Sequence, residues 1–287
     1  MHPIISLLEP AAAPEHGLLT DDLAAIYGSN LYLPQSAESE TRPFVYANFV
    51  SSLDGVVSYN LPDNPNGSIV GGGSDGDLFI LCLLRACAEA VIVGWNSVRS
   101  EGGTARTAAA ADPRRRDLYT DLRRQLYGNK RPLNVILSGS GQLDFSQSIF
   151  HNDELDVLIV VPESAEAGVK DAVLSLPHTA YHVMDGSNDL DPVQVLHLLR
   201  KSRGLRRCLL EGGPRVMGSF LRSGCVDELF LTLSPRVAGR SEESQRPGFV
   251  SGVAFDPKNS PPASLVSLRR QGDYLFSRYR IGAEREI

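Results

Sequence analysis

The stretch from Arg206 to Leu221 is predicted to be a strand that turns on two glycines into a helix. Its sequence is Arg-Arg-Cys-Leu-Leu-Glu-Gly-Gly-Pro-Arg-Val-Met-Gly-Ser-Phe-Leu. The apolar run at Cys208 predicts a buried strand, and Pro214 suits the first position of a helix, where its missing N–H has no intrahelical partner to lose. Bare glycine backbone and free N–H groups at a helix start can bind a phosphate. A tight turn that binds nothing has the same pattern, so this stretch alone leaves both interpretations open.

Apolar runs and helical segments alternate along most of the chain. Six short runs predict strands, at residues 44–50, 90–93, 133–137, 157–161, 180–184 and 208–210. Helical patterns lie between and after them, at residues 77–89, 112–127, 164–175, 192–203 and 214–221. Strands separated by helices imply parallel crossovers. Beyond Leu221 the pattern changes to a strand at 227–233 and a hairpin of 265–270 with 274–281. We therefore expect an α/β fold, a mostly parallel sheet flanked by helices, with an antiparallel C-terminal hairpin.

The first 43 residues differ in composition from the rest. They are rich in Ala, Pro, Ser and Glu, and one short helix is expected after Thr20, which can cap it. We expect residues 1–43 to form an N-terminal arm that packs on the main body or on a partner chain. Residues 44–287 are expected to form one domain.

Charge and cysteine usage narrow the class of protein. The 287 residues carry a net charge of −6, from 28 Lys and Arg against 34 Asp and Glu, so we expect no nucleic-acid partner. The four cysteines form no C-x-x-C pair and lie in apolar contexts, so we predict reduced core thiols and no metal site. No apolar run approaches the roughly 18 residues of a membrane span, and no leader is apparent. We therefore expect no membrane partner and a cytoplasmic location.

Residues Gly71 to Gly76 formally match G-x-G-x-x-G, the pattern of a dinucleotide-binding turn. We reject this interpretation because the preceding strand would be too short. In addition, the next predicted strand ends in Gly94 and not in the acid that holds a ribose. The glycines are instead predicted to lead into a helix capped by Ser74 or Asp75.

That helix is apolar nearly all round, which predicts burial. Its one cation, Arg85, needs a partner. From the residues alone we expect an internal pair with Glu89 on the next turn, and an anionic ligand is the alternative. The basic residues of the following helix are expected to form a solvated face: Arg114, Arg115, Arg116, Arg123 and Arg124.

The residues after two other predicted strands also suit a ligand. Gly94 to Arg99 forms a second strand-to-helix turn, in which Asn96 or Ser97 could cap a short helix and offer N–H groups to a phosphate. Ser51 to Gly55 is a polar turn directly after a buried strand, a common place for ligand contacts in an open sheet. For Ser51 to Gly55, an ordinary Asp-Gly turn that binds no ligand is an equally consistent interpretation.

The chain shows none of the usual motifs for covalent or metal-dependent catalysis. It lacks a G-x-S-x-G elbow, H-E-x-x-H, a Walker motif and the paired motifs of zinc deaminases. Glycine turns after strands suit a bound dinucleotide or a phosphorylated small molecule. Hydride transfer would need little acid or base from the protein, because the cofactor carries the chemistry.

Taken in order, these motifs resemble a known family. The set is Ser52-Leu-Asp-Gly55, Val91-Ile-Val-Gly94 with Ser97-Val-Arg99, Glu211-Gly-Gly-Pro214, and Asp227-Glu-Leu229 with Pro235 and Gly239. Over residues 42–281 the chain resembles the reductase domain of bacterial riboflavin biosynthesis, the C-terminal half of the bifunctional deaminase–reductase. The resemblance implies a dihydrofolate reductase-like fold and a homodimer. It also implies NADPH-dependent reduction of a ribosylaminopyrimidinone phosphate to its ribitylamino form.

The resemblance also implies roles for particular residues. Asp54 would be catalytic, beside the nicotinamide and the substrate ribose, and Arg85 would meet the substrate phosphate. Asn48 and Glu211 would also face the substrate, and Ser138 would lie near the 2′-phosphate of NADPH. The other cofactor-binding residues implied are Ser52, Gly94, Asn96, Ser97, Val98, Arg99, Glu211, Gly212, Gly213 and Pro214.

Three departures from the family pattern leave the substrate open. The motifs cover only the reductase half, so we expect this chain to supply only reduction. Asn48 stands where the family commonly has lysine. Glu101-Gly102-Gly103 and a loop of small residues replace the family's Asp-Asn-Pro and downstream arginine. We therefore expect the substrate to be 5-amino-6-ribosylaminopyrimidinedione phosphate, a related pterin such as dihydrofolate, or another molecule with a C=N bond. A non-catalytic nucleotide-binding protein is the alternative of another class.

Overall fold

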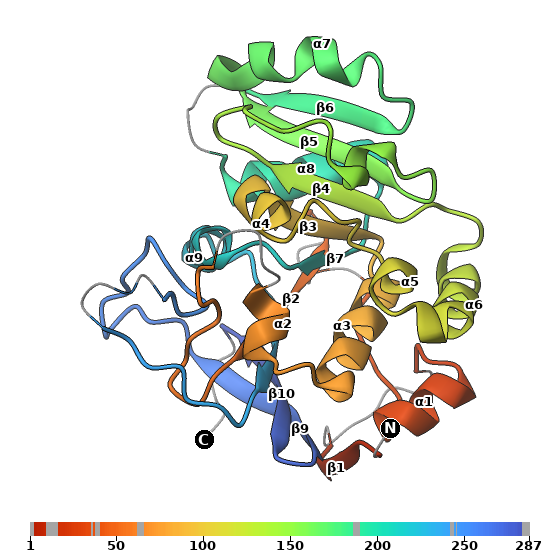
Figure 1. Cartoon of the computed structure of the whole chain (residues 1–287), viewed down its shortest axis with the longest axis vertical. Helices are drawn as coiled ribbons and strands as arrows, with labels where there is room; N and C mark the ends of the chain where they lie inside the picture. The colour runs from red at the N-terminus through yellow and green to blue at the C-terminus, as the bar shows by residue number, and fades with distance from the viewer. Residues whose placement is uncertain are drawn as a thin grey trace.

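One ten-stranded sheet runs through the described part of the chain (Figure 1). The computed structural model describes residues 3–9, 17–35, 37, 41–61, 66–185, 190–241, 244 and 246–282. The strands are β1 (Ile5–Leu8), β2 (Phe44–Ser51), β3 (Ala90–Gly94), β4 (Leu133–Leu137), β5 (Asp156–Pro162), β6 (Thr179–Met184), β7 (Arg207–Leu210), β8 (Glu228–Leu233), β9 (Ala263–Gln271) and β10 (Tyr274–Ile281). Their spatial order is β1-β9-β10-β8-β2-β7-β3-β4-β5-β6.

Helices cover both faces of this sheet (Figure 1). They are α1 (Asp21–Tyr27), α2 (Asn66–Val70), α3 (Asp75–Cys87), α4 (Trp95–Ser100), α5 (Ala108–Ala111), α6 (Arg116–Tyr127), α7 (Lys170–Val173), α8 (Pro192–Arg203) and α9 (Pro214–Arg222). Side chains of α1, α3, α5 and α6 pack on one face, and those of α8 and α9 pack on the other. The central strands are apolar on both sides, because both sides are covered.

The expected fold class is confirmed. From β8 through β2, β7, β3, β4 and β5 to β6, neighbouring strands pair in parallel. The pairs of β8 with β10, β10 with β9, and β9 with β1 are antiparallel. Parallel strands begin and end at the same edges of a sheet, so the turns that follow β2, β7, β3 and β8 lie side by side.

Three helix predictions differ from the structure in detail. The helix expected over residues 112–127 begins with a 3₁₀ turn, Pro113–Arg115, before α6. Helix α3 begins at Asp75, two residues earlier than expected, because the Ser74 Oγ accepts a hydrogen bond from the backbone N–H of Asp77 (3.2 Å) and caps it there. The helix expected over residues 164–175 is a 3₁₀ turn, Glu163–Gly168, followed by the short α7.

The prediction of a solvated basic face on the helix after Asp112 is wrong for part of that face. Arg115 forms ion pairs with Asp75 and with the buried Asp112. The Arg123 guanidinium donates to the backbone oxygen of Ala88 (2.6 Å), at the C-terminal end of α3. These arginines therefore join α6, and the turn directly before it, to both ends of α3.

The N-terminal segment joins the sheet and its core. Strand β1, which was not predicted, pairs with β9, while the expected helix after Thr20 is present as α1. Leu23 and Tyr27 of α1 are buried in the same apolar cluster as α3. All four cysteines are free and buried, as predicted, and none of the helices in the described segments is long and apolar enough to cross a membrane.

Candidate active site

The two predicted strand-to-helix turns lie next to each other. Strands β3 and β7 pair in parallel, and the N–H of Glu211 donates to the backbone oxygen of Ile92 (3.0 Å). The N–H of Gly213 donates to the Ser97 Oγ (2.9 Å), which joins the start of α9 to α4. The structure thus brings together the residues Gly94 to Arg99 and Glu211 to Pro214, which the sequence holds far apart.

Close packing explains the glycines at the base of both turns. A Cβ at Gly212 would lie 2.7 Å from the Val216 Cγ1, and one at Gly94 would lie 2.9 Å from the Val216 Cγ2. Real Cβ atoms do not approach other atoms so closely, so the first turn of α9 can sit against β3 only because both positions are glycine. This requirement holds whether or not a ligand binds.

We expect Gly212→Ala to lower the free energy of unfolding by about 1–3 kcal/mol, because the added methyl group overpacks this contact. Urea unfolding measures the change. Gly139→Ala is the matched control: nothing lies within 4 Å of a Cβ at Gly139, so its effect should stay within about 0.5 kcal/mol. Equal effects for the two variants would contradict the packing argument.

The outer side of the same turns fits a phosphate-bearing group. In the first turn of α9, the N–H groups of Arg215 and Val216 have no intrahelical partner, and the helix dipole favours an anion there. The side chains of Asn96, Arg99 and Arg215 are exposed on these turns. Free donors and two cations around a helix start are what a dinucleotide diphosphate requires.

Arg85 and Glu211 form a buried ion pair beside these turns. The Arg85 Nε and Nη2 each lie 2.6 Å from a carboxylate oxygen of Glu211, and the two side chains are only 5% and 6% exposed. The predicted pair of Arg85 with Glu89 is therefore wrong. The Glu89 carboxylate instead accepts from the backbone N–H groups of Arg206 and Arg207, at the start of β7.

A second buried arginine, Arg106, lies close to this pair. Its guanidinium contacts Glu101 and donates to the backbone oxygen of Ser97 (3.2 Å), and its Nε has no partner among the described residues. Arg85 in turn donates to the backbone oxygen of Thr107, the next residue (3.5 Å). The expectation that this loop lacks an arginine is wrong. In the sequence, the feature that indicates Arg106 is that it is the single cation in the run Gly-Gly-Thr-Ala-Arg-Thr-Ala.

Asp54 holds the loop that follows β8. Its carboxylate accepts from the Ser52 Oγ (2.6 Å) and from the backbone N–H groups of Ala238 (3.0 Å) and Gly239 (2.8 Å). These hydrogen bonds, that of Ser52 first, hold the pKa of Asp54 well below its usual range. Arg240 also donates to the Asp54 backbone oxygen (2.8 Å). Asp54 is therefore an ionised acceptor that fixes loop geometry.

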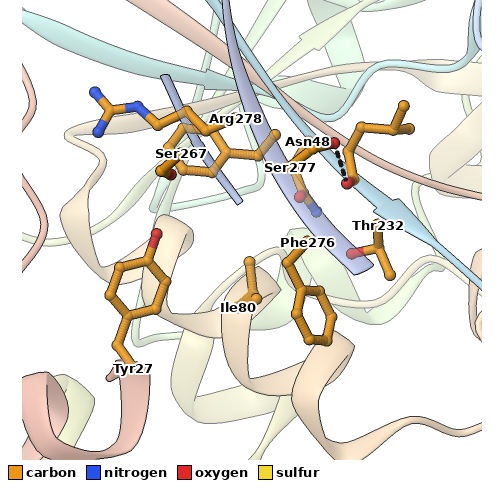
Figure 2. A pocket seen from close by; sticks show the side chains of 10 residues that line it. Tyr27, Asn48, Ile80, Thr232, Ser267, Phe276, Ser277 and Arg278 are labelled. Atoms are coloured by element: carbon orange, nitrogen blue, oxygen red, sulfur yellow. Dashed lines mark hydrogen bonds between the residues drawn. The ribbon is translucent and has the colours of Figure 1, made fainter. Parts of the chain in front are cut away.

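Asn48 lines a small cavity between the sheet and helices α1 and α3 (Figure 2). Ala47 pairs with Leu210, the last residue of β7, so Asn48 lies next to Glu211, the residue that follows β7. The Asn48 Oδ1 is buried and has no hydrogen-bond partner among the described residues. The cavity wall nearest to α3 also includes Ile80, Thr232 and Phe276.

Besides Arg85 and the two glycines Gly94 and Gly212, three expected site residues are buried. Ser52 is fully buried and bound to Asp54, and the side chain of Val98 lies in an apolar cluster under α4. Ser138 is 4% exposed, and its Oγ accepts from the N–H of Gly141 (3.2 Å). Each of the three can take part in cofactor binding mainly through its backbone or through the turn that it shapes.

The fold and the site define a class, an α/β domain whose candidate ligand-binding edge lies at the carboxyl ends of the parallel strands β2, β7 and β3. The family model of the RibD C-terminal domain matches residues 43–264. The chain therefore belongs to the RibD C-terminal domain family.

The chain is similar in sequence or in structure to several known proteins. The chain is 27% identical over 201 residues to the 2,5-diamino-6-ribosylamino-4(3H)-pyrimidinone 5′-phosphate reductase of Archaeoglobus fulgidus, covering 69% of this chain and 83% of that one. It is 22% identical to the riboflavin biosynthesis protein RibD of Aquifex aeolicus and spans 49% of its length. Among solved structures, a pyrimidine reductase-like protein from Corynebacterium diphtheriae has a TM-score of 0.66 at 22% identity, covering 92% of this chain and all of that one.

Proposed function

We propose that this protein is an NADPH-dependent reductase of a ribosylaminopyrimidine phosphate, acting in riboflavin biosynthesis. The observation that carries the proposal is the contact of the two turns at Gly94 and Gly213, with exposed donors and cations on their outer side. Membership of the RibD C-terminal domain family and the names of the relatives support the reduction of a pyrimidine.

Residues of both turns would hold the cofactor. Asn96, Arg99 and the start of α9 are the groups available to its phosphates, and the turn after Ser138 would receive the 2′-phosphate that distinguishes NADPH from NADH. When bound, the reduced nicotinamide supplies the hydride. Asp54 would act beside it as a positioning residue, because its ionised carboxylate fixes the loop at Ala238 and Gly239.

Arg85 and Arg106 would bind the substrate phosphate. Both guanidinium groups are buried, and each is neutralised by a glutamate, Glu211 or Glu101. A phosphate that enters between them would compete with these carboxylates, so substrate binding is expected to open the Arg85–Glu211 pair. Glu211 would then be free to accept a hydrogen bond from a ribose hydroxyl.

The test is a substrate panel followed at the absorbance of the reduced nicotinamide. We expect oxidation of NADPH, faster than of NADH, with the diaminopyrimidinone or the pyrimidinedione substrate. Oxidation with dihydrofolate alone would favour a pterin reductase, the second candidate substrate class. A thermal shift with NADPH but no turnover on any substrate would favour a non-catalytic nucleotide-binding protein.

We also propose that the protein is a homodimer and that it is cytoplasmic. Light scattering of the active fraction tests the homodimer, and cell fractionation tests the location.

Asp54→Asn is expected to lower kcat/KM by about 100-fold, because an amide cannot accept from both backbone N–H groups and the loop at Ala238 loses its position. Steady-state kinetics with NADPH measure the loss. Asp144→Asn is a matched control, since Asp144 is exposed and its hydrogen bonds are local, to Ser146. Wild-type kinetics in Asp54→Asn would show that this loop does not shape the site.

A further inference from the structure

We infer that Asp77 is the acid that protonates the substrate nitrogen during the reduction, a role that rests on the function proposed above. The reaction needs a proton donor, and Asp54 is a poor one because hydrogen bonds keep it ionised. The described histidines lie away from the carboxyl ends of β2 and β8, in β6, α8 and the loops beside β4 and β5.

Asp77 lies at the carboxyl ends of β2 and β8. It occupies the first turn of α3, and its carboxyl group contacts the hydroxyl group of Thr232 on β8. Thr232 pairs with Val50, two residues beyond Asn48 on β2. The Asp77 Oδ2 also fills the space beside Gly71, where a Cβ would lie 2.9 Å away.

Asp77 lies next to the wall of the cavity at Asn48, because its partner Thr232 lines that cavity. Ile80 lies one helical turn after Asp77 and, together with Thr232 and Asn48, lines the cavity wall (Figure 2). The Asn48 Oδ1, buried and without a protein partner, is an acceptor available to a substrate N–H group. A substrate nitrogen held over Asn48 would therefore have the Asp77 carboxyl group on its β8 side.

The turn that leads into α3 meets the loop that Asp54 holds. A Cβ at Gly72 would lie 2.4 Å from the Arg236 Nε, so the turn before α3 rests directly on Arg236. The backbone oxygen of Arg236 accepts from the N–H of Leu53 (2.7 Å), the neighbour of Asp54. The start of α3, with Asp77 in its first turn, is thus packed against Thr232 on β8 and against the loop that pairs with Leu53.

The charged groups around Asp77 leave it able to hold a proton. On its own helix, Asp75 is engaged by Arg114 and Arg115. The loop after β8 brings Arg236, and the residues of β9 and β10 beside Gly76 are the uncharged Gln271 and Phe276. No ion pair between described side chains includes Asp77, and burial raises its pKa to about 6.

The proton completes a balanced step. In the ring-opened form of the ribosylamine, the C1′ carbon is doubly bonded to the exocyclic nitrogen. Reduction would add a hydride, which the bound cofactor would supply, to this carbon. The electron pair of the C=N bond would move to nitrogen, which would take the proton of Asp77. The products are the ribitylamine, the oxidised cofactor and the Asp77 carboxylate, which regains a proton from water.

The experiment compares Asp77→Asn with Asp75→Asn in the full chain, using NADPH and the pyrimidine phosphate that the wild type reduces. We expect Asp77→Asn to lower kcat by about 100-fold or more, with KM within about threefold, and to abolish the fall of kcat at rising pH. Asp77→Glu should restore part of kcat and the pH dependence. Asp75→Asn, whose carboxylate faces Arg114 and Arg115, should keep the wild-type kcat and pH profile.

Two results would overturn this role while leaving the reduction in place. One is an Asp77→Asn variant with wild-type kcat or with an unchanged pH profile, and the other is a loss confined to KM. Near-wild-type circular dichroism and NADPH binding of Asp77→Asn exclude misfolding as the cause of a low kcat. A wild-type protein that reduces no pyrimidine phosphate would reject the proposed function itself, and the role of Asp77 with it.

Discussion

Replacement of Arg85 by methionine is expected to lower the free energy of unfolding by about 3–5 kcal/mol, because it leaves the Glu211 carboxylate buried without its partner. The pair is bidentate, with both N–O distances at 2.6 Å, and both side chains are almost fully buried. Urea unfolding measures the loss, and the same variant should lose binding of the substrate phosphate.

A double-mutant cycle separates the pair from the cavity around it. Arg85→Met combined with Glu211→Met removes both charges and should recover much of the stability, since a buried pair can be replaced by apolar groups at little net cost. Arg124→Met is the matched control, because its pair with Asp121 is 64% and 63% exposed and should contribute less than about 1 kcal/mol. A loss no larger than that of the control would mean that Arg85 is not buried as an ion.

The second large effect is a dependence of stability on pH that originates at Asp77. Its pKa is about 6 in the folded protein against 3.8 for the free side chain. Between these values the folded state keeps a proton that the unfolded state has released, so stability falls as pH rises from about 3 to about 6.5. The expected contribution of Asp77 to this fall is about 3 kcal/mol.

The measurement is the difference between wild type and Asp77→Asn, because other carboxylates titrate in the same range. Urea unfolding of both proteins at pH 4 and at pH 7 gives two differences. The stability of the wild type relative to the variant should be lower at pH 7 by about 2 kcal/mol, because at pH 4 the unfolded side chain is already partly ionised. A difference that does not change with pH would show that Asp77 ionises normally, as a solvated carboxyl group does.

Most of the sheet was predictable from the sequence because its central strands are continuous apolar runs. Strand β4 at Leu133–Leu137, helix α8 at Pro192–Arg203 and strand β10 at Tyr274–Ile281 lie where they were expected. Strand β1 was missed because it has only four residues and lies at the edge of the sheet, where one neighbour is enough and the side chains need not be apolar on both faces.

The turns of the candidate site were predictable from the sequence, but the ion pairs between its side chains were not. The glycine turns follow apolar strands, which is a local pattern, and the resemblance supplied Asp54 and Arg85. The partner of Arg85 lies 126 residues away, and spacing along a helix could suggest only Glu89. Arg106 and Asp77 went unnoticed because nothing in a single sequence shows that a charged side chain of a loop or of a helix start faces inward.

The order of the strands has a consequence for synthesis on the ribosome. Strand β7 lies between β2 and β3 in the sheet, although both of these emerge long before it. Until β7 appears, both strands present open hydrogen-bonding edges, and Arg85 is without Glu211. A nascent chain of this kind exposes unpaired, aggregation-prone strand edges during much of its translation. Its folding depends on long-range contacts that form late. Chaperone binding should therefore be strongest on chains arrested before residue 207 and should fall once β7 is released.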